Sequence, residues 1–190
     1  MTKKIKVAFQ GDKGAYSHIA SLEAFPNIEP IACATFEEAF QMAMDDAQFK
    51  IIIPIENSLA GRVADIHYLI PKYKLQIHAE HFQKVSHCLL GVKGAKIKDI
   101  KIVRSHSQAI GQCKKLIVNN NLKSIISADT AGSAKYVAEK KNKNEAAIAS
   151  ELAAKIYNLD VLKSNVQDET GNVTRFLVMG RDSKHPEFKE

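Results

Sequence analysis

The fold class is decided by the stretch Ile51-Ile52-Ile53-Pro54-Ile55-Glu56-Asn57-Ser58-Leu59-Ala60-Gly61. Four of its first five residues are isoleucines with no alternating polar residues, which predicts a strand buried on both faces of an α/β sheet. Pro54 has no backbone N–H to donate, so we expect the regular strand to end or bulge near it. Glu56, Asn57 and Ser58 would then lie at the carboxyl end of the strand, where open α/β sheets bind their ligands.

The composition is that of an ordinary globular protein: 190 residues, of which 45% are hydrophobic and 25% charged. The basic N-terminus lacks the apolar stretch of a secretory signal, and no segment is apolar enough to span a membrane. Cys33, Cys88 and Cys113 are widely spaced and form no CxxC motif, which favours reduced, partly buried thiols over disulfides or zinc. We therefore expect a cytoplasmic protein that has no membrane partner.

The net charge of +6 comes mostly from lysines scattered along the chain, since only four residues are arginines. No basic run is interleaved with aromatic residues, so we expect a solvated lysine surface and no nucleic-acid partner. A positive field would still favour an anionic substrate. His78 and His81 form an HxxH pair, but residues 75–82 alternate like a strand, which would place the two rings on opposite faces. We expect no metal site.

The first part of the chain alternates strands and helices. We expect a strand at residues 4–10, a glycine loop at residues 11–17 whose free N–H groups could hold an anion, and a helix at residues 18–25. The loop matches neither GxGxxG nor a Walker loop, so nucleotide binding is poorly supported. Thr35 and Glu38 form a capping box, each satisfying a backbone donor of the other, that would start a helix through about Asp45.

Two strand-like stretches, residues 75–83 and 85–92, follow without a helix between them, and we place a crossover into a second lobe there. Strands at residues 101–104, 124–128 and 146–149 then alternate with helices at residues 109–119, 134–141 and 152–157. A strand at residues 171–180 would return to the first lobe. The expected fold class is α/β, with two lobes of mixed, largely parallel sheet flanked by helices: residues 1–82 plus 170–190, and residues 83–169.

Several predicted strands end in hydroxyl or amide side chains at the opening of a helix: Asn57 with Ser58, Ser105 with Gln108, Thr130 with Ser133, and Ser150. Each of them is readily explained as a helix cap, and Asn57 with Ser58 would cap a helix from about Arg62 to Ile70. Together, on two lobes, they indicate one cleft that holds a small anion through neutral donors and helix N-termini. The residues by themselves support a small-anion binder and name no reaction.

Alternation along the last strand would place Thr174 and Phe176 on one face and Arg175 on the other. Thr174 and Arg175 should therefore not both enter the cleft unless the strand begins after Thr174. The simpler interpretation is that Thr174 is a β-former and Arg175 belongs to a structural ion pair.

Five motifs occur along the chain in the order typical of one enzyme family: Gly11-Asp12-Lys13-Gly14-Ala15-Tyr16-Ser17, Pro54-Ile55-Glu56-Asn57-Ser58 with Gly61 and Val63, Ser105-His106-Ser107-Gln108-Ala109, Ala147-Ile148-Ala149-Ser150, and Asn172-Val173-Thr174-Arg175-Phe176. With them the chain resembles the catalytic domain of prephenate dehydratase, from about Ile5 to Gly180. The PIENS and TRF motifs are the specific ones.

The resemblance implies two lobes similar to a type II periplasmic-binding-protein fold, with the active site in the cleft between them and no cofactor. It also implies an enzyme, a lyase of phenylalanine biosynthesis that converts prephenate to phenylpyruvate with loss of water and carbon dioxide. Prephenate is a dicarboxylate whose reaction creates an aromatic ring, so the site mainly has to orient it and help hydroxide leave.

Carried over by motif, Thr174 would donate to the departing hydroxyl, and Arg175 would either bind a carboxylate or hold the shape of the cleft. Phe176 would pack against the substrate ring or fill the core, and Glu56 would be structural because a free carboxylate repels a dianion. The residues that would position the carboxylates and the keto group are Asn57, Ser58, Ser105, Gln108 and Thr130.

The chain departs from the family pattern in three places. Ser107 stands where the family usually has proline, and Asp12 and Tyr16 replace the proline and phenylalanine of the glycine loop. The chain stops at Glu190, where many members continue into a phenylalanine-binding ACT domain, so it is either a naturally short enzyme or a trimmed one without that domain.

Related enzymes associate, and we expect a homodimer. Two alternatives stay open: an arogenate dehydratase, whose substrate differs only in its side chain, and a sensor module of the same fold that binds an anion without turnover.

Overall fold

The computed structural model describes residues 5–25 and 27–181, and within it the chain divides into two compact units. The first unit runs up to Asp12, then from Tyr16 to Lys84, and again from Val173 onwards; the second contains Lys13–Ala15 and Val85–Asn172. From the sequence we placed the main borders at residues 82/83 and 169/170 and did not separate residues 13–15 from the first lobe.

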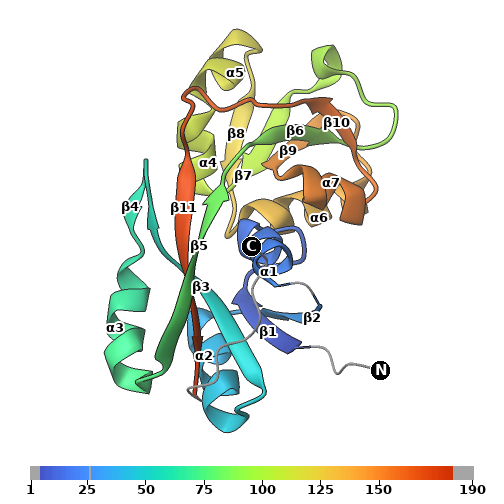
Figure 1. Ribbon diagram of the computed structural model, residues 1–190. Helices are drawn as coiled ribbons and strands as arrows, with labels where there is room; N and C mark the ends of the chain where they lie inside the picture. Colours follow the sequence, from blue (N-terminus) through green and yellow to red (C-terminus); the bar gives the residue numbers. More distant parts are fainter. Residues whose placement is uncertain (1–4, 26, 182–190) are drawn as a thin grey trace. The chain divides into compact units, whose positions relative to one another are not determined.

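The first unit is built on a six-stranded sheet with the order β2-β1-β3-β11-β5, in which β4 pairs with β3 (Figure 1). β1 is parallel to β2 and β3, whereas β11 is antiparallel to both of its neighbours, β3 and β5. The strands are β1 (Ile5–Gln10), β2 (Ile28–Cys33), β3 (Phe49–Asn57), β4 (Gly61–Arg62), β5 (Gln76–Lys84) and β11 (Val173–Gly180).

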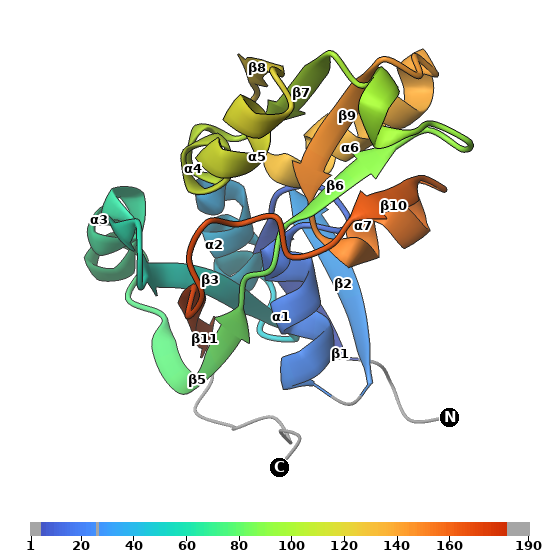
Figure 2. The same ribbon diagram turned by 90° about the horizontal axis from the view of Figure 1, so that it is seen from above.

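Helices cover both faces of this sheet: α1 (Tyr16–Ala24) lies on one face, and α2 (Phe36–Asp45) and α3 (Ala64–Tyr73) on the other (Figure 2). The isoleucines of β3 divide between them. Ile52 packs in the cluster that includes Ala20 of α1, whereas Ile51 and Ile53 pack in the cluster that includes Phe40 of α2. The predicted strand with two buried faces is therefore confirmed, because successive side chains of a strand point to opposite faces.

Pro54 lies within β3, which bulges beside it and continues. Along β11, Arg175 pairs with Glu56 and Phe176 pairs with Pro54, so Ile55 is the extra residue of the bulge. The described pairing of β1 with β3 ends at Ile51, so the ladder with β1 does not require an N–H from Pro54. The predicted bulge near Pro54 is confirmed.

The second unit has a five-stranded sheet with the order β10-β6-β9-β7-β8. All five residues of β9 are buried, so both faces of the sheet are covered there. The strands are β6 (Cys88–Gly91), β7 (Ile102–Ser105), β8 (Lys123–Ile126), β9 (Glu145–Ala149) and β10 (Asp160–Lys163). The helices are α4 (Ser107–Gln112), α5 (Lys114–Asn119), α6 (Thr130–Lys140) and α7 (Glu151–Ile156), with a 3₁₀ turn at Ile97–Asp99.

Two helix-flanked mixed sheets were predicted and are confirmed, but the sheets are less parallel than expected, and β2, β4 and β10 were not foreseen. Of the strand pairings described, four are parallel and five antiparallel. Apart from β3 with β4, every antiparallel pair described contains β6 or β11. Each of these two strands follows a border where the chain passes from one unit to the other.

The helix predicted at residues 109–119 is two helices, α4 and α5, separated at Cys113. The carbonyl of Gln112 accepts a hydrogen bond of 2.7 Å from the N–H of Asp168, and the carboxylate of Asp168 accepts one of 3.0 Å from the N–H of Lys115. A distant segment thus takes the carbonyl and the N–H that one continuous helix would have used.

A buried polar cluster lies beside this break. The Oε1 atom of Gln112 accepts a hydrogen bond of 2.8 Å from Nδ2 of Asn172, and it lies 2.9 Å from Nε2 of His87. Since a carbonyl oxygen only accepts, Nε2 must carry the hydrogen. Burial lowers the pKa of His87, partly opposed by the hydrogen bond to Gln112. His87 is therefore a neutral imidazole at neutral pH.

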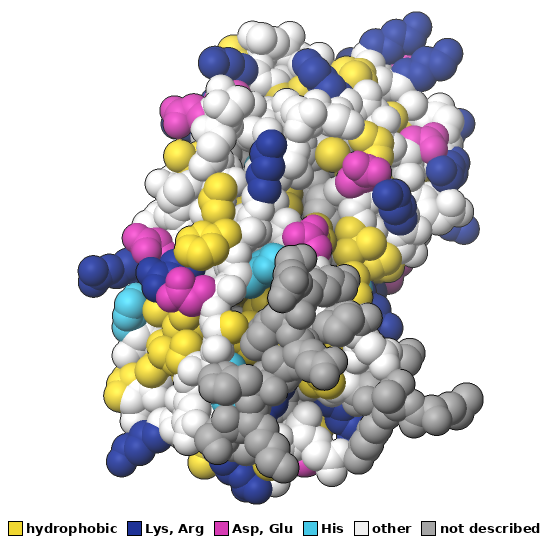
Figure 3. Space-filling view, viewed as in Figure 1, with side chains coloured by type: hydrophobic (Ala, Val, Ile, Leu, Met, Phe, Trp, Pro, Cys, Tyr) yellow, Lys and Arg dark blue, Asp and Glu magenta, His cyan; other side chains and the backbone are white. Residues whose placement is uncertain are grey.

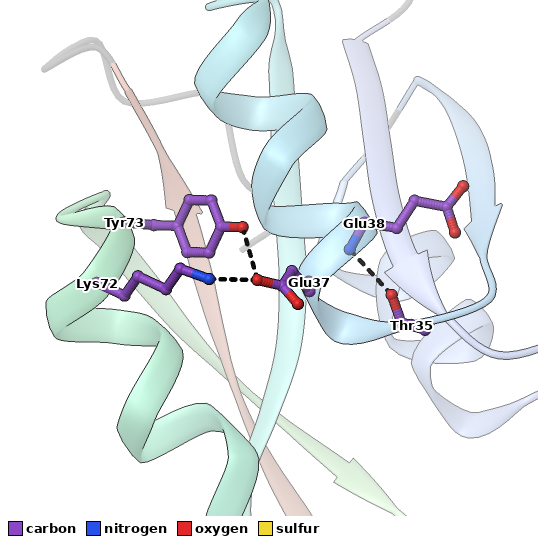
Figure 4. A network of polar contacts seen from close by, with 5 residues as sticks. All are labelled: Thr35, Glu37, Glu38, Lys72 and Tyr73. Atoms are coloured by element: carbon purple, nitrogen blue, oxygen red, sulfur yellow. Dashed lines mark hydrogen bonds and ion pairs between the residues drawn. The ribbon is translucent and has the colours of Figure 1, made fainter.

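The capping box at the start of α2 forms with one shift. The N–H of Glu38 donates to Oγ1 of Thr35 over 3.1 Å, as predicted (Figure 4). The carboxylate of Glu38, however, accepts from the N–H of Ala34 at 2.7 Å and not from that of Thr35. The side chain of Glu38 therefore reaches one residue further back than in the usual motif.

The neighbouring Glu37 ties α2 to α3. Its carboxylate accepts a hydrogen bond of 3.2 Å from the hydroxyl of Tyr73 and forms an ion pair with Lys72 (Figure 4). Both charged side chains are exposed, so the ion pair adds little stability compared with the core contacts between the helices.

The three cysteines are free and buried, which confirms the predicted thiols. Burial raises the pKa of Cys33 to about 11 and that of Cys113 to about 12. These thiols are protonated and therefore poor nucleophiles at neutral pH.

On the face shown in Figure 3, lysine and arginine side chains lie scattered among acidic and uncharged ones and do not gather in one patch. In the part of the chain that the structure describes, no helix has the length and apolar character needed to cross a membrane.

The Thr35 cap gives a first test. Thr35→Ala removes the acceptor of the Glu38 N–H and should lower the free energy of unfolding by about 1 kcal/mol, measured by urea denaturation. Glu37→Gln in the same turn only weakens an exposed ion pair and should have a smaller effect. Equal losses in the two variants would contradict the capping role.

The neutral state of His87 predicts acid sensitivity. In the unfolded chain this histidine takes up a proton below about pH 6.5, whereas in the folded chain its lowered pKa delays protonation. The unfolded state then binds more protons, so the free energy of unfolding should fall as the pH drops below about 6.5, by at most about 1.4 kcal/mol per pH unit from this one group. Urea denaturation at several pH values should show a shallower dependence in His87→Gln, and identical slopes would refute this origin.

Candidate active site

The predicted site residues fall into two groups. The first unit contains Asn57, Ser58, Thr174, Arg175 and Phe176, and the second contains Ser105, Gln108 and Thr130.

Asn57, the last residue of β3, links two parts of the first unit. Its Oδ1 accepts the N–H groups of Leu59 at 3.0 Å and Ala60 at 2.9 Å, which closes a turn after the strand. Its Nδ2 donates to Oγ1 of Thr174 over 2.9 Å and to the carbonyl of Val173 over 3.3 Å. The interpretation of Asn57 as a helix cap is therefore wrong, since α3 begins after Val63 and has no side-chain cap.

Ser58 holds the backbone of the same neighbour. Its N–H donates to the carbonyl of Val173 over 2.9 Å, and its Oγ accepts the N–H of Val173 at 3.0 Å. Asn57 and Ser58 together fix both polar backbone groups of the residue that precedes Thr174.

Thr174 is 8% exposed, and its hydroxyl is oriented by Asn57. A threonine hydroxyl offers one hydrogen and accepts through its oxygen. Because the oxygen accepts from the amide of Asn57, the hydroxyl hydrogen is left to be donated elsewhere. The same N–H would stabilise negative charge on Oγ1 if that hydrogen were given away. This arrangement suits a hydrogen-bond donor or weak acid.

Arg175 lies on the opposite face of β11 from Thr174 and Phe176, as the alternation predicted. Its Nη2 forms an ion pair with Glu80 of β5, and the two side chains are 41% and 42% exposed. The hydrogen bond and charge of Glu80 raise the pKa of Arg175, and Glu56 adds a smaller contribution. Its Nε atom is buried and has no hydrogen-bond partner among the described residues.

Phe176 is 1% exposed and belongs to the core cluster that contains Phe9, Ile52 and Val178. Of the two roles expected from the sequence, it fills the core. In this conformation its ring cannot contact a ligand, because a side chain so deeply packed offers no surface to one.

Three hydroxyls of the second unit are occupied by structural hydrogen bonds. Ser105 is 0% exposed and donates to the carbonyl of Ile148 over 2.6 Å. Ser133 donates to the carbonyl of Asp129 over 2.7 Å. Ser150 caps α7 by accepting the N–H of Ala153 at 3.0 Å. Ser105 therefore joins β7 to β9, and in this conformation its hydroxyl is not available to a substrate.

Gln108 and Thr130 occupy the first turns of α4 and α6 and are not buried. The caps of these helices are their neighbours: Nδ1 of His106 accepts the N–H of Gln108 at 3.3 Å, and Oδ1 of Asp129 accepts the N–H of Gly132 at 2.6 Å. Capping therefore does not use the side chains of Gln108 and Thr130.

Gly14 of the glycine loop makes a close contact within the second unit. Its φ angle is +96°, and a Cβ atom there would lie 2.8 Å from Cα of Ala153. Its carbonyl accepts a hydrogen bond of 2.5 Å from Ser150. The glycine is thus required by packing against α7.

A pocket of about 430 Å³ in the second unit is lined by Lys93, Lys141 and Lys143 and contains none of the predicted residues. It lies where α6 and α7 end, since Lys141 and Tyr157 are their C-caps and both line it. Helix C-terminal ends carry partial negative charge, which the lysines of the pocket can neutralise, so these lysines are explained without an anionic ligand.

The cluster of His87, Gln112 and Asn172 was not found from the sequence. Gln112 is spaced like an ordinary helix residue, and no local pattern indicates that its partners are 25 and 60 residues away.

Known proteins resemble this chain over nearly its whole length. A family model described as prephenate dehydratase matches residues 7–184. Arogenate dehydratase/prephenate dehydratase 1 of Arabidopsis thaliana, a chloroplastic protein, is 44% identical over 183 residues, which are 96% of this chain and 47% of that protein. A bifunctional N-acyl-homoserine lactone acylase/prephenate dehydratase of Komagataeibacter europaeus is 41% identical over 175 residues, 92% of this chain and 62% of that protein.

Solved structures give the same result. A prephenate dehydratase of Arthrobacter aurescens in complex with L-Phe has a TM-score of 0.86 at 26% identity, covering 96% of this chain and 62% of that one. A quorum-quenching acylase, GqqA, has a TM-score of 0.87 at 40% identity, covering 94% and 65%. A putative lipoprotein of Clostridium difficile, with a TM-score of 0.51 at 13% identity, shares the fold alone.

The chain spans 47% and 62% of the length of the two relatives named above. Within this chain, the matched residues 7–184 include all five motifs on which the resemblance was based. The chain therefore belongs to the prephenate dehydratase family.

Proposed function

We propose that the chain converts prephenate to phenylpyruvate with loss of water and carbon dioxide. The observation that carries this proposal is the hydrogen bond of 2.9 Å from Nδ2 of Asn57 to Oγ1 of Thr174. It joins the PIENS and TRF motifs and leaves the threonine hydrogen to be donated.

In the proposed reaction the bond between the ring and its carboxylate breaks, and the electron pair moves into the ring as carbon dioxide leaves. The bond to the ring hydroxyl breaks at the far side of the ring. Thr174 donates its hydrogen to the departing oxygen, which leaves as water, and Asn57 stabilises the charge on Oγ1. Solvent then returns one proton to Thr174, so the reaction consumes one proton overall.

Binding of the dicarboxylate is assigned to the remaining predicted residues. We propose that Ser58, Gln108 and Thr130 are substrate-binding residues. For Gln108 and Thr130 this assignment is supported by the caps of their helices, which are made by other residues and leave these two side chains unused. Arg175, which lies on the opposite face of β11 from Thr174, holds the shape of the site through its ion pair with Glu80. Ser105 and Phe176 act from the interior, the first by joining strands and the second by packing.

The substrate is either prephenate or arogenate, and we propose prephenate as the main one. The names of the Arabidopsis relative include both activities. The deciding assay incubates the purified chain with each substrate and measures phenylpyruvate or phenylalanine by chromatography. Turnover of arogenate alone would overturn the prephenate proposal, and binding without turnover of either would favour a sensor module.

We also propose a homodimer in a reducing compartment, with the cytoplasm as predicted. The free, buried thiols support such a compartment. Edge strand β5 exposes Ile77 and Phe82, which supports self-association.

Thr174→Ala should lower kcat for prephenate by about 10²-fold or more, because it removes the donor to the leaving hydroxyl. Thr174→Ser keeps a hydroxyl and should lose far less. Thr35→Ala is the matched control, since it removes a threonine hydroxyl from the same unit outside the family motifs. A folded Thr174→Ala enzyme with unchanged kcat would remove Thr174 from the chemistry.

The role of Arg175 predicts a different kinetic pattern. Arg175→Lys keeps the charge but loses the planar fork, so KM for prephenate should rise about tenfold or more while kcat changes less. Glu80→Gln, which breaks the ion pair but keeps the arginine, should raise KM by a smaller factor. If both variants only lose stability at unchanged KM, Arg175 stabilises the fold and does not shape the site.

A further inference from the structure

The peptide bond from Asn172 to Val173 joins the second unit to the first, two residues before Thr174. On the Val173 side, Ser58 binds both polar backbone groups, at 2.9 Å and 3.0 Å. The position of Thr174 therefore depends on how Asn172 is held as well.

Asn172 is held through its side chain and its backbone. It is 2% exposed, and its Nδ2 donates to Oε1 of Gln112 over 2.8 Å. Its carbonyl accepts the N–H of Val85 at 2.8 Å. Gln112 thus helps to fix the orientation of the Asn172 amide.

Gln112 is in turn held in place from other directions. Its Oε1 also lies 2.9 Å from Nε2 of the buried His87, and its backbone carbonyl accepts the N–H of Asp168 at 2.7 Å. Lone pairs of one oxygen therefore serve two buried donors. An acceptor constrained by two donors and its own backbone has little freedom to move.

The segment that leads to Asn172 is fixed to the same neighbours. The N–H of Val166 donates to the carbonyl of His87 over 2.9 Å, and the N–H of His87 donates to Oε1 of Gln167 over 2.9 Å. Residues 166–172 are thus held by polar contacts at both ends within the second unit, with Gln112 at the end that leads to Val173.

We infer that Gln112 is a positioning residue for Thr174, acting through Asn172. This inference rests on the proposed function. Gln112 touches no reacting atom; its oxygen helps to orient Asn172, the residue that precedes β11. A displacement of about 1 Å at a reacting group can lower a rate by about 10²-fold, so loss of this acceptor should reduce kcat while the substrate-binding groups remain.

The test uses the 190-residue chain and prephenate. Gln112→Met keeps the length of the side chain and removes the acceptor, and kcat should fall by about 10-fold to 100-fold while KM stays within about threefold. Gln112→Glu keeps an acceptor oxygen and should recover most of the lost kcat. Asn120→Ala is the control, because it removes another side-chain hydrogen bond of the second unit, of 2.8 Å, outside this cluster.

Asn172→Ala provides a second route if Gln112→Met does not fold. It removes the donor and should lower kcat to a similar extent. The double variant Gln112→Met/Asn172→Ala should lose no more than the worse single variant, because both changes break one interaction. Circular dichroism and urea denaturation establish that each variant is folded.

The outcomes separate this role from the proposed function. If the unaltered chain converts prephenate and folded Gln112→Met or Asn172→Ala has the same kcat, the positioning role alone is overturned. The positioning role is also overturned if the fold-loss of kcat in the double variant equals the product of the two single losses, since the residues would then act independently. No turnover of prephenate or arogenate by the unaltered chain overturns the proposed function and the positioning role with it.

Discussion

The arrangement around Thr174 depends on one extra residue in β3. On the far side of the bulge, Phe176 pairs with Pro54 and Leu177 with Ile53; on the near side, Arg175 pairs with Glu56 and Thr174 with Asn57. If Ile55 did not bulge, the pairing would continue in register and Thr174 would lie opposite Glu56. Cross-strand partners share a face of the sheet, so the bulge places an amide beside the Thr174 hydroxyl and moves the carboxylate to the other face, towards Arg175. Pro54, which cannot donate to a ladder, makes this position of the bulge favourable.

The hydroxyls at the strand ends differ in what they leave available. Ser105, Ser133 and Ser150 each use their hydrogen to bind a backbone carbonyl of the second unit. Thr174 instead receives a hydrogen bond from a side chain, and its own hydrogen remains to be given. Similar hydroxyl residues near the ends of strands therefore serve different purposes. The direction of a single hydrogen bond distinguishes a hydroxyl that stabilises the fold from one that is suited to act on a ligand.

The sequence predicted those features that depend on local patterns. The isoleucine strand, the bulge at Pro54, the start of α2 and the alternation along β11 all follow from neighbouring residues, and the structure contains each of them. Features that depend on distant partners were missed. The helix break at Cys113 arises from Asp168, which binds a residue 53 positions away. For Phe176 the sequence left two roles open, and strands from three parts of the first unit decide that it fills the core. The sequence could not decide whether Asn57 caps a helix, because its partner, Thr174, is 117 residues away.

The charges near Thr174 agree with the chemistry of the proposed reaction. A dianionic substrate is converted into a monoanion, carbon dioxide and water, so negative charge leaves the ring carboxylate as the transition state is reached. A bare cation bound to that carboxylate would hold the substrate more tightly than the transition state and would slow the reaction. In the structure the cation of β11, Arg175, is already paired with Glu80 and lies near Glu56, whereas Thr174 has a neutral amide as its partner. The charge of Arg175 is thus compensated on the other face of β11, and the departing oxygen meets a neutral hydroxyl held by an amide, which stabilises charge where it develops.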